Sequence, residues 1–187
     1  AAVTELATNG VQIIMSLNFG NRLYSGPDER MIPQLWEWNY DMPKPPTTPE
    51  ALAAWARYVE FMVKHFQGRV RHFEIWNEWN ISCYWGDHPN LDHFLAVTRT
   101  AIPIIRKYAP EAKIMMGSIA GFPHGISKWT PDNLAQQEKK TSYLQAMRAL
   151  AKEVDEIGWH PFYNSDPNSL LDYSRDVRAF QKWLASA

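Results

Sequence analysis

The chain has 187 residues, the length of one ordinary domain, so we expect a single domain over 1–187. Its 19 Lys and Arg nearly balance its 20 Asp and Glu, and the formal net charge of −1 offers no electrostatic attraction for nucleic acid or an anionic membrane surface. No apolar run approaches the ~20 residues of a membrane span, whereas 9 Trp, 8 Tyr and 8 Phe supply many rings for a core or for stacking surfaces.

The first part of the chain predicts two strands separated by a long loop and a helix. The stretch GVQIIMSLNFG (10–20) has an apolar centre and ends in turn residues, which favours a strand buried on both faces. After a proline-rich loop, Thr48 precedes a proline and an acidic residue, which is a typical helix start. Apolar residues then recur at helical spacing as far as a stop at Gly68. The stretch VRHFEIW (70–76) is the second predicted strand.

The second part of the chain repeats this alternation. The predicted elements, in order, are a helix from Asn90 to Tyr108, a strand over 112–118, a helix over 142–154, a strand over 156–163 and a helix from Tyr173 onward. Strands that alternate with helices indicate the α/β class, with a parallel sheet covered by helices.

Two architectures fit this pattern, an open doubly wound sheet and a (β/α)8 barrel. A nucleotide-binding open sheet has a glycine-rich phosphate turn after its first strand, and SLNFGN is not such a turn. Polar residues instead recur just past the predicted strand ends, where barrel enzymes keep their reactive groups. They are Asn18, Asn21, Asn77, Glu78, Ser118, His160 and Tyr163. We therefore predict a partial (β/α)8 TIM barrel of about four βα units.

Three strand contexts carry a family resemblance. FEIWNEWN (73–80) resembles the strand-four signature W-N-E-P-N of the clan A retaining glycoside hydrolases, with Trp79 in place of the usual proline. NFGNRLY (18–24) resembles strand three of family 5-like and family 39-like members, and DEIGWHPFY (155–163) resembles their strand six. The resemblance follows the right order over nearly the whole chain.

The resemblance implies that Glu78 is the general acid/base and that Asn77 binds the sugar hydroxyl beside the reacting carbon. Such an acid must stay protonated near neutral pH, and burial among apolar walls such as Trp76 and Trp79 raises the pKa of a carboxyl. Strict strand alternation sends adjacent residues to opposite faces. Asn77 and Glu78 share one site only if the strand breaks its alternation there, as strands often do beside active sites.

Further residues are predicted to bind an oligo- or polysaccharide substrate, and each also has an ordinary structural interpretation. A histidine alone is most often a satisfied core or loop residue, an asparagine can be a turn residue, and tryptophans frequently pack in the core. The predicted substrate-binding residues beside Asn77 are His160, Tyr163, Asn21, Tyr24, Trp85 and Trp159.

A complete barrel needs eight strands and typically ~250 residues, whereas only four strands are predicted here. By the resemblance they are strands three to six, so the nucleophile glutamate of strand seven would lie beyond residue 187. We therefore expect an internal fragment of the parent enzyme, inactive alone. The alternatives are a carbohydrate-binding barrel that no longer hydrolyses and a metal-dependent barrel isomerase. His88 and His93 have poor spacing for a metal, so no metal or cofactor is predicted.

Overall fold

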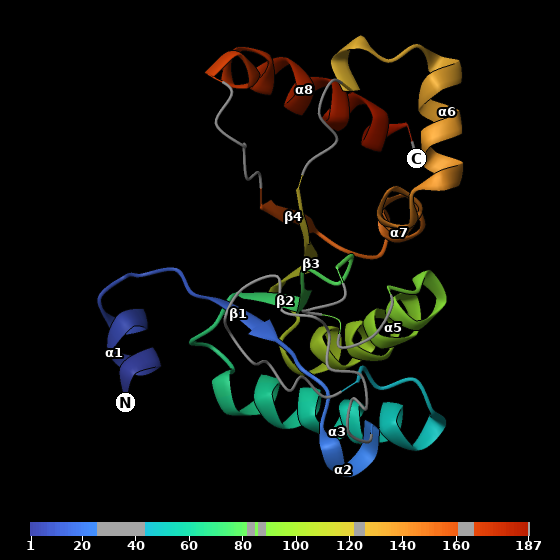
Figure 1. Ribbon diagram of the computed structural model, residues 1–187. Helices are drawn as coiled ribbons and strands as arrows, with labels where there is room; N and C mark the ends of the chain where they lie inside the picture. The colour runs from blue at the N-terminus through green and yellow to red at the C-terminus, as the bar shows by residue number, and fades with distance from the viewer. Residues whose placement is uncertain (26–43, 82–84, 86–88, 122–125, 161–166, 187) are drawn as a thin grey trace.

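Four parallel strands form one sheet in the order β1-β2-β3-β4. The computed structural model describes residues 1–25, 44–81, 85, 89–121, 126–160 and 167–186, with backbone alone over 167–172. The strands are β1 (Ile14–Leu17), β2 (His72–Asn77), β3 (Lys113–Ala120) and β4 (Glu156–His160), and all are labelled in Figure 1. Each strand lies beside the next one in sequence, which is the arrangement of consecutive barrel strands.

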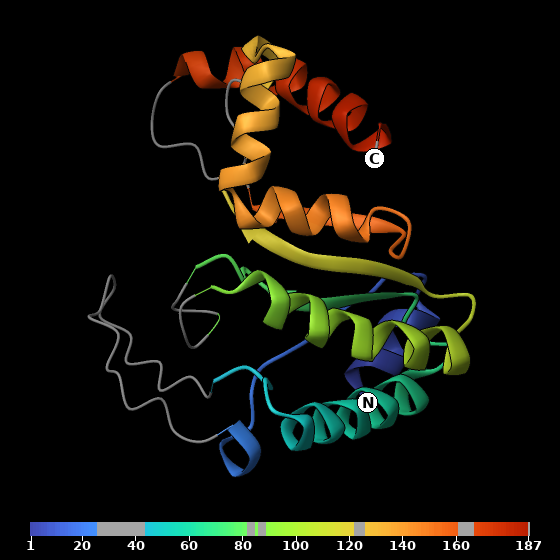
Figure 2. The ribbon, with the colours of Figure 1, turned by 90° about the vertical axis from the view of Figure 1, so that its right-hand side faces the viewer.

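Helices separate the strands and pack on one another in sequence order. They are α1 (Ala2–Thr8), α2 (Arg22–Ser25), α3 (Pro49–Phe66), α5 (Leu91–Tyr108), the 3₁₀ turn η1 (Ile126–Lys128), α6 (Pro131–Lys140), α7 (Ser142–Leu150) and α8 (Pro167–Ala185). Helix α5 packs against α3 and α7, and α6 against α7 (Figure 2). Within the described part of the chain, no helix is long and apolar enough to cross a membrane.

The helix starts follow the local signals in the sequence. The side chain of Thr48 accepts a hydrogen bond from the Ala51 backbone N–H at 3.2 Å, and Asn90 caps α5 in the same way. Sequence analysis predicted no element between the strand over 112–118 and the helix over 142–154, and so it missed α6. Thr130 precedes a proline and an aspartate there, just as Thr48 precedes a proline and a glutamate, and its hydroxyl accepts from Asn133 N–H. The same capping pattern would have identified α6.

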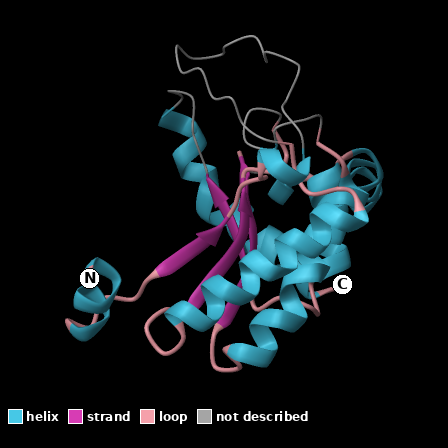
Figure 3. Cartoon of the chain, turned by 90° about the horizontal axis from the view of Figure 1, so that it is seen from below, coloured by secondary structure: helices cyan, strands magenta, loops and turns pink. Residues whose placement is uncertain are grey.

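The two faces of the sheet differ in burial. Leu17, Phe73 and Ile75 on the helix-covered face are fully buried, as are Ile114 and Met116 on the same side. The opposite face carries polar or exposed residues, and Ile14 on it is 57% exposed. Figure 3 shows the four strands side by side, with most of the helices to one side of them. The parallel sheet and its helices have the architecture of half a (β/α)8 barrel, so the predicted fold class is confirmed.

Strand β3 contains a bulge near its carboxyl end. Between the register pairs Met116↔Ile157 and Ile119↔Trp159, β3 uses one residue more than β4. A bulge breaks the regular alternation of side chains and re-aims those beyond it. This irregularity lies beside the part of β2 that leads to Glu78, since Ser118 is paired with Asn77.

Candidate active site

The carboxyl ends of the four strands meet at one edge of the sheet. Asn18 follows β1, Glu78 follows β2, Ala120 ends β3 and His160 ends β4. Parallel strands in register carry these ends to the same side, and barrel enzymes place their reactive groups there. Asn18, Glu78 and His160, which sequence analysis placed past strand ends, therefore lie along one rim.

Glu78 is a buried carboxylic acid held beside a histidine. Only 6% of the residue is exposed. Its Oε1 lies 2.6 Å from Nδ1 of His160, at the end of the strand two places away in the sheet. The backbone N–H of Glu78 donates to the carbonyl of Ser118 at 2.6 Å. A buried acid with a titratable partner and a fixed backbone is typical of a catalytic carboxyl, because these features restrict its geometry and its access to water.

The backbone leaves the extended conformation at the end of β2. Trp76 has φ +73° and Glu78 has φ +44°, both in the left-handed region that non-glycine residues seldom adopt. Strict alternation would point Trp76 to the opposite face from Ile75, yet its ring lies 5.9 Å from that of Trp55 on α3. The alternation is therefore broken here, as the expectation for Asn77 and Glu78 required. Asn77 ends β2 and is half-buried.

The tryptophans around Glu78 form a packed aromatic cluster. Trp76, Trp79 and Trp85 are fully buried, and Trp79 stacks on Phe94 with centroids 4.0 Å apart and planes 4° apart. The Trp85 ring lies 5.0 Å from that of Trp76 and contacts Trp79 and Phe94 edge-on. Trp85 was expected to bind substrate, but aromatic neighbours already occupy the space around its ring, so it belongs to the core instead.

Trp159 also packs away from the rim. It precedes His160 in β4, and adjacent residues of a strand point to opposite faces. Its ring lies 5.7 Å from that of Phe180 on α8, and its indole N–H donates to the Tyr173 hydroxyl at 3.3 Å. The expectation that Trp159 binds sugar is therefore corrected: its side chain packs against α8, whereas the neighbouring His160 contacts Glu78.

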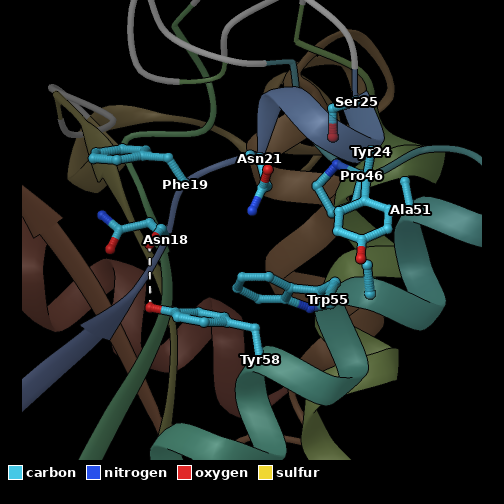
Figure 4. Close-up of a pocket in the computed structure, with 11 residues that line it drawn as sticks. Asn18, Phe19, Asn21, Tyr24, Ser25, Pro46, Ala51, Trp55 and Tyr58 are labelled. Carbon is cyan, nitrogen blue, oxygen red and sulfur yellow. Dashed lines mark hydrogen bonds between the residues drawn. The ribbon is translucent and has the colours of Figure 1, made fainter.

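Asn21 and Tyr24 line a pocket of about 220 Å³ beside the end of β1. Figure 4 shows the Asn18 and Phe19 end of β1 with Tyr24 from α2 and with Trp55 and Tyr58 from α3 around it. The hydroxyl of Tyr58 donates to the Asn18 carbonyl at 3.3 Å, and burial raises the pKa of Tyr58.

Asn21 also stabilises the start of α2. Its Oδ1 accepts the Leu23 N–H at 2.9 Å at the start of α2, as a turn residue would. Tyr24 is 40% exposed, with the Arg57 guanidinium 5.7 Å from its ring centroid. Amide and aromatic groups at one pocket suit a sugar, which offers hydroxyls at its edges and an apolar face. Tyr163 lies outside the described residues, so its position in the site stays a prediction.

Sequence analysis missed two residues near Glu78. Glu74, four residues earlier in β2, is 8% exposed and accepts hydrogen bonds from the backbone N–H and hydroxyl of Ser118. Asn80 pairs its side-chain amide with Ala120, donating to the carbonyl at 3.0 Å and accepting from the N–H at 2.8 Å. The period-two alternation of polar His72 and Glu74 with apolar residues would have identified Glu74 as facing the barrel interior.

A metal centre is not formed by the residues that the structure describes, since none of their His, Cys, Asp and Glu side chains cluster in threes. One histidine–carboxylate pair of the interior face lies away from the rim. His72 Nδ1 lies 3.0 Å from Glu156 Oε2 near the amino ends of the strands, far along the sheet from the rim. Among the described residues of the rim, Glu78 and His160 are the two titratable groups in direct contact.

Comparison with known proteins finds similarity in structure alone. No protein-family model matches the sequence, and no curated protein matches it. The crystal structure of xylanase 10B from Thermotoga petrophila RKU-1 in complex with xylobiose superposes with a TM-score of 0.51 at 16% identity, covering 97% of this chain and 48% of that one. The structure of GH10 from Paenibacillus barcinonensis gives 0.48 at 18% identity, covering 96% and 51%.

The chain therefore spans about half the length of these two structures. At such identity the similarity shows the fold and not the activity. Together with the strand order, it establishes that the chain has the architecture of about half a (β/α)8 barrel.

Proposed function

We propose that this chain carries the acid/base half of the active site of a retaining glycoside hydrolase of clan A that acts on β-linked oligo- or polysaccharides. The observation that carries the proposal is the buried Glu78 carboxyl, 2.6 Å from His160 at the carboxyl rim of a half barrel. The W-N-E context of Glu78 supports it. So does the structural neighbour, which is a xylanase bound to xylobiose.

In the proposed reaction, Glu78 first donates its proton to the departing glycosidic oxygen. A second carboxylate attacks the anomeric carbon as the bond to that oxygen breaks, and a covalent glycosyl intermediate forms. Glu78, now ionised, then removes a proton from the water that releases the sugar. His160 holds the Glu78 carboxyl through Nδ1, and Asn77 binds the hydroxyl next to the reacting carbon. Asn21 and Tyr24 contact the sugar at the neighbouring pocket.

In the proposed reaction the nucleophile belongs to a seventh strand of the full-length protein, as the resemblance to clan A enzymes implies. Retention needs two carboxyl groups about 5–5.5 Å apart. Two other buried carboxylates are described, and both are already engaged. Glu74 accepts from Ser118, and Asp176 accepts from the Ser127 N–H at 3.0 Å. We infer that a segment outside these 187 residues supplies the nucleophile and that this chain alone does not hydrolyse glycosides.

The test is Glu78→Gln in the full-length protein, which keeps the shape of the side chain but removes its acid. We expect hydrolysis of unactivated β-xylo-oligosaccharides to fall by about 10²–10⁴-fold, the usual contribution of general acid–base catalysis. The fall in the glycosylation step should be much smaller with aryl glycosides whose leaving group departs without a proton. Glu156→Gln is the matched control, since it removes an interior carboxylate at the opposite end of the sheet.

Two results would contradict the proposal. Equal activity of Glu78→Gln and Glu156→Gln would show that Glu78 does not act as the acid. A wild-type full-length protein that binds xylo-oligosaccharides in calorimetry without turning them over would instead support the non-catalytic carbohydrate-binding barrel.

A further inference from the structure

Glu74 is a buried carboxylate that the proposed reaction does not use. It lies mid-strand in β2, paired with Ser16 of β1 and Met115 of β3. Burying a carboxylate is costly unless hydrogen bonds compensate it. Among the described residues the compensation comes from Ser118. Its backbone N–H donates to Glu74 Oε1 at 3.0 Å, and its hydroxyl donates to the same oxygen.

Ser118 is available to Glu74 because of the bulge in β3. Alternation from buried Met116 would turn Ser118 toward the helices, but the extra residue between Met116 and Ile119 re-aims it toward the barrel interior. Gly158 on β4 leaves the necessary room, since a Cβ there would lie 2.2 Å from the Ser118 hydroxyl oxygen. Gly117 allows the close approach to β2, where a Cβ would lie 2.3 Å from the Ile75 carbonyl.

Ser118 in turn holds the backbone of Glu78. Its carbonyl accepts the Glu78 N–H at 2.6 Å, at a residue whose φ of +44° needs such support. One residue therefore bonds Glu74 through its N–H and hydroxyl and Glu78 through its carbonyl. Loss of the Glu74 carboxylate would leave two buried donors of Ser118 without their acceptor, and the bulge would rearrange to satisfy them.

We propose that Glu74 is a positioning residue for Glu78, acting through Ser118. This inference rests on the proposed function, in which Glu78 must lie within bonding distance of the glycosidic oxygen. Displacement of a catalytic group by about 1 Å can lower the rate about 10²-fold. Glu74 makes no contact with substrate in this arrangement, and it acts by fixing where the strand turns into the rim.

The experiment compares Glu74→Ala, Glu74→Gln and Glu156→Ala in the full-length protein. Glu74→Gln keeps an oxygen that accepts both Ser118 donors. Glu156→Ala removes an interior carboxylate that pairs with His72 and does not touch Ser118. For Glu74→Ala we expect kcat on unactivated substrate to fall about 10²-fold, with little change in KM. With well-activated aryl glycosides the loss of kcat/KM, which reports the glycosylation step, should largely disappear because their leaving group departs without a proton. Glu74→Gln should restore most of the rate.

A second readout does not depend on activity. Hydrogen exchange of the segment that contains the Glu78 amide, followed by mass spectrometry, should be faster in Glu74→Ala than in wild type and unchanged in Glu74→Gln and Glu156→Ala. If Glu74→Ala does not fold, the experiment uses Ser118→Ala instead. This variant removes the hydroxyl that donates to Glu74 and keeps the backbone N–H. It should give the same pattern with a smaller loss.

The outcomes separate this inference from the proposed function. Faster exchange at Glu78 in a protein that hydrolyses no glycoside would support positioning by Glu74 while overturning the proposed reaction. Unchanged exchange in Glu74→Ala would overturn the role of Glu74. So would a loss of kcat/KM that is equal for activated and unactivated substrates and is also seen in Glu156→Ala.

Discussion

Replacing Gly158 by alanine should expose the tight packing between β4 and the Ser118–Glu74 pair. The new Cβ would lie 2.2 Å from the Ser118 hydroxyl oxygen, whereas real Cβ contacts stay above 3.0 Å, so this oxygen must move by at least 0.8 Å. That movement breaks its bond to Glu74, and a hydrogen bond to a charged group contributes about 1.5–3 kcal/mol. We expect Gly158→Ala to lower the free energy of unfolding by about 2–3 kcal/mol, since overpacking alone typically costs about 1–3 kcal/mol.

The Ser118→Ala background isolates this clash. With the hydroxyl removed, the closest remaining contacts of the new Cβ are 3.2 Å, to the Ser118 Cβ and the Met115 sulfur. Alanine also restricts the unfolded chain more than glycine does, which stabilises by about 0.4–1 kcal/mol. Gly158→Ala should therefore be close to neutral in that background.

The assay is urea unfolding of the wild type, the two single variants and the double variant, followed by tryptophan fluorescence. The expected coupling between the two substitutions is about 2 kcal/mol, well above the few tenths found for independent sites. Additive effects, with Gly158→Ala costing the same in both backgrounds, would refute the packing argument.

Two further predictions concern stability. Burial raises the pKa of the Asp155 carboxyl, but the hydrogen bond from Ile114 N–H and the Arg106 guanidinium at 2.9 Å outweigh it, and the net pKa is lowered. A carboxyl whose pKa is lower in the folded than in the unfolded protein stabilises the folded state at pH values above its unfolded pKa of ~3.9. This stabilisation is lost as the pH falls through the folded pKa. Asp155→Asn should thus cost about 1–3 kcal/mol in urea unfolding at pH 7, and the difference from wild type should shrink at pH 3; an equal cost at both pH values would contradict this. Phe94→Ala removes the ring that stacks on Trp79 and should lower the free energy of unfolding by about 3–5 kcal/mol in thermal unfolding. A loss below about 1 kcal/mol would contradict the packing of Phe94 in the core.

Much of the architecture follows from local signals. Thr48 and Asn90 begin helices because their side chains satisfy free backbone N–H groups within the same turn, and this depends on adjacent residues only. Runs of apolar residues set the places of the four strands, although β1 occupies only Ile14–Leu17 of the expected 10–20. Glu78 was selected as the candidate acid from its immediate W-N-E context, through the family resemblance. Helix α6 was missed although the same kind of signal precedes it at Thr130.

Side-chain direction at the rim was decided by tertiary structure. Trp85 is enclosed by the aromatic cluster, and Trp159 packs against α8. Neither orientation is indicated by the sequence. The partners of Glu78 and Glu74 lie 82 and 44 residues away in the chain, at His160 and Ser118. These contacts depend on strand register, on the bulge in β3 and on the left-handed backbone of Glu78. Each arises when separate strands pack together, so the sequence alone determined which acid stands at the rim, and the packed sheet determined what holds it there.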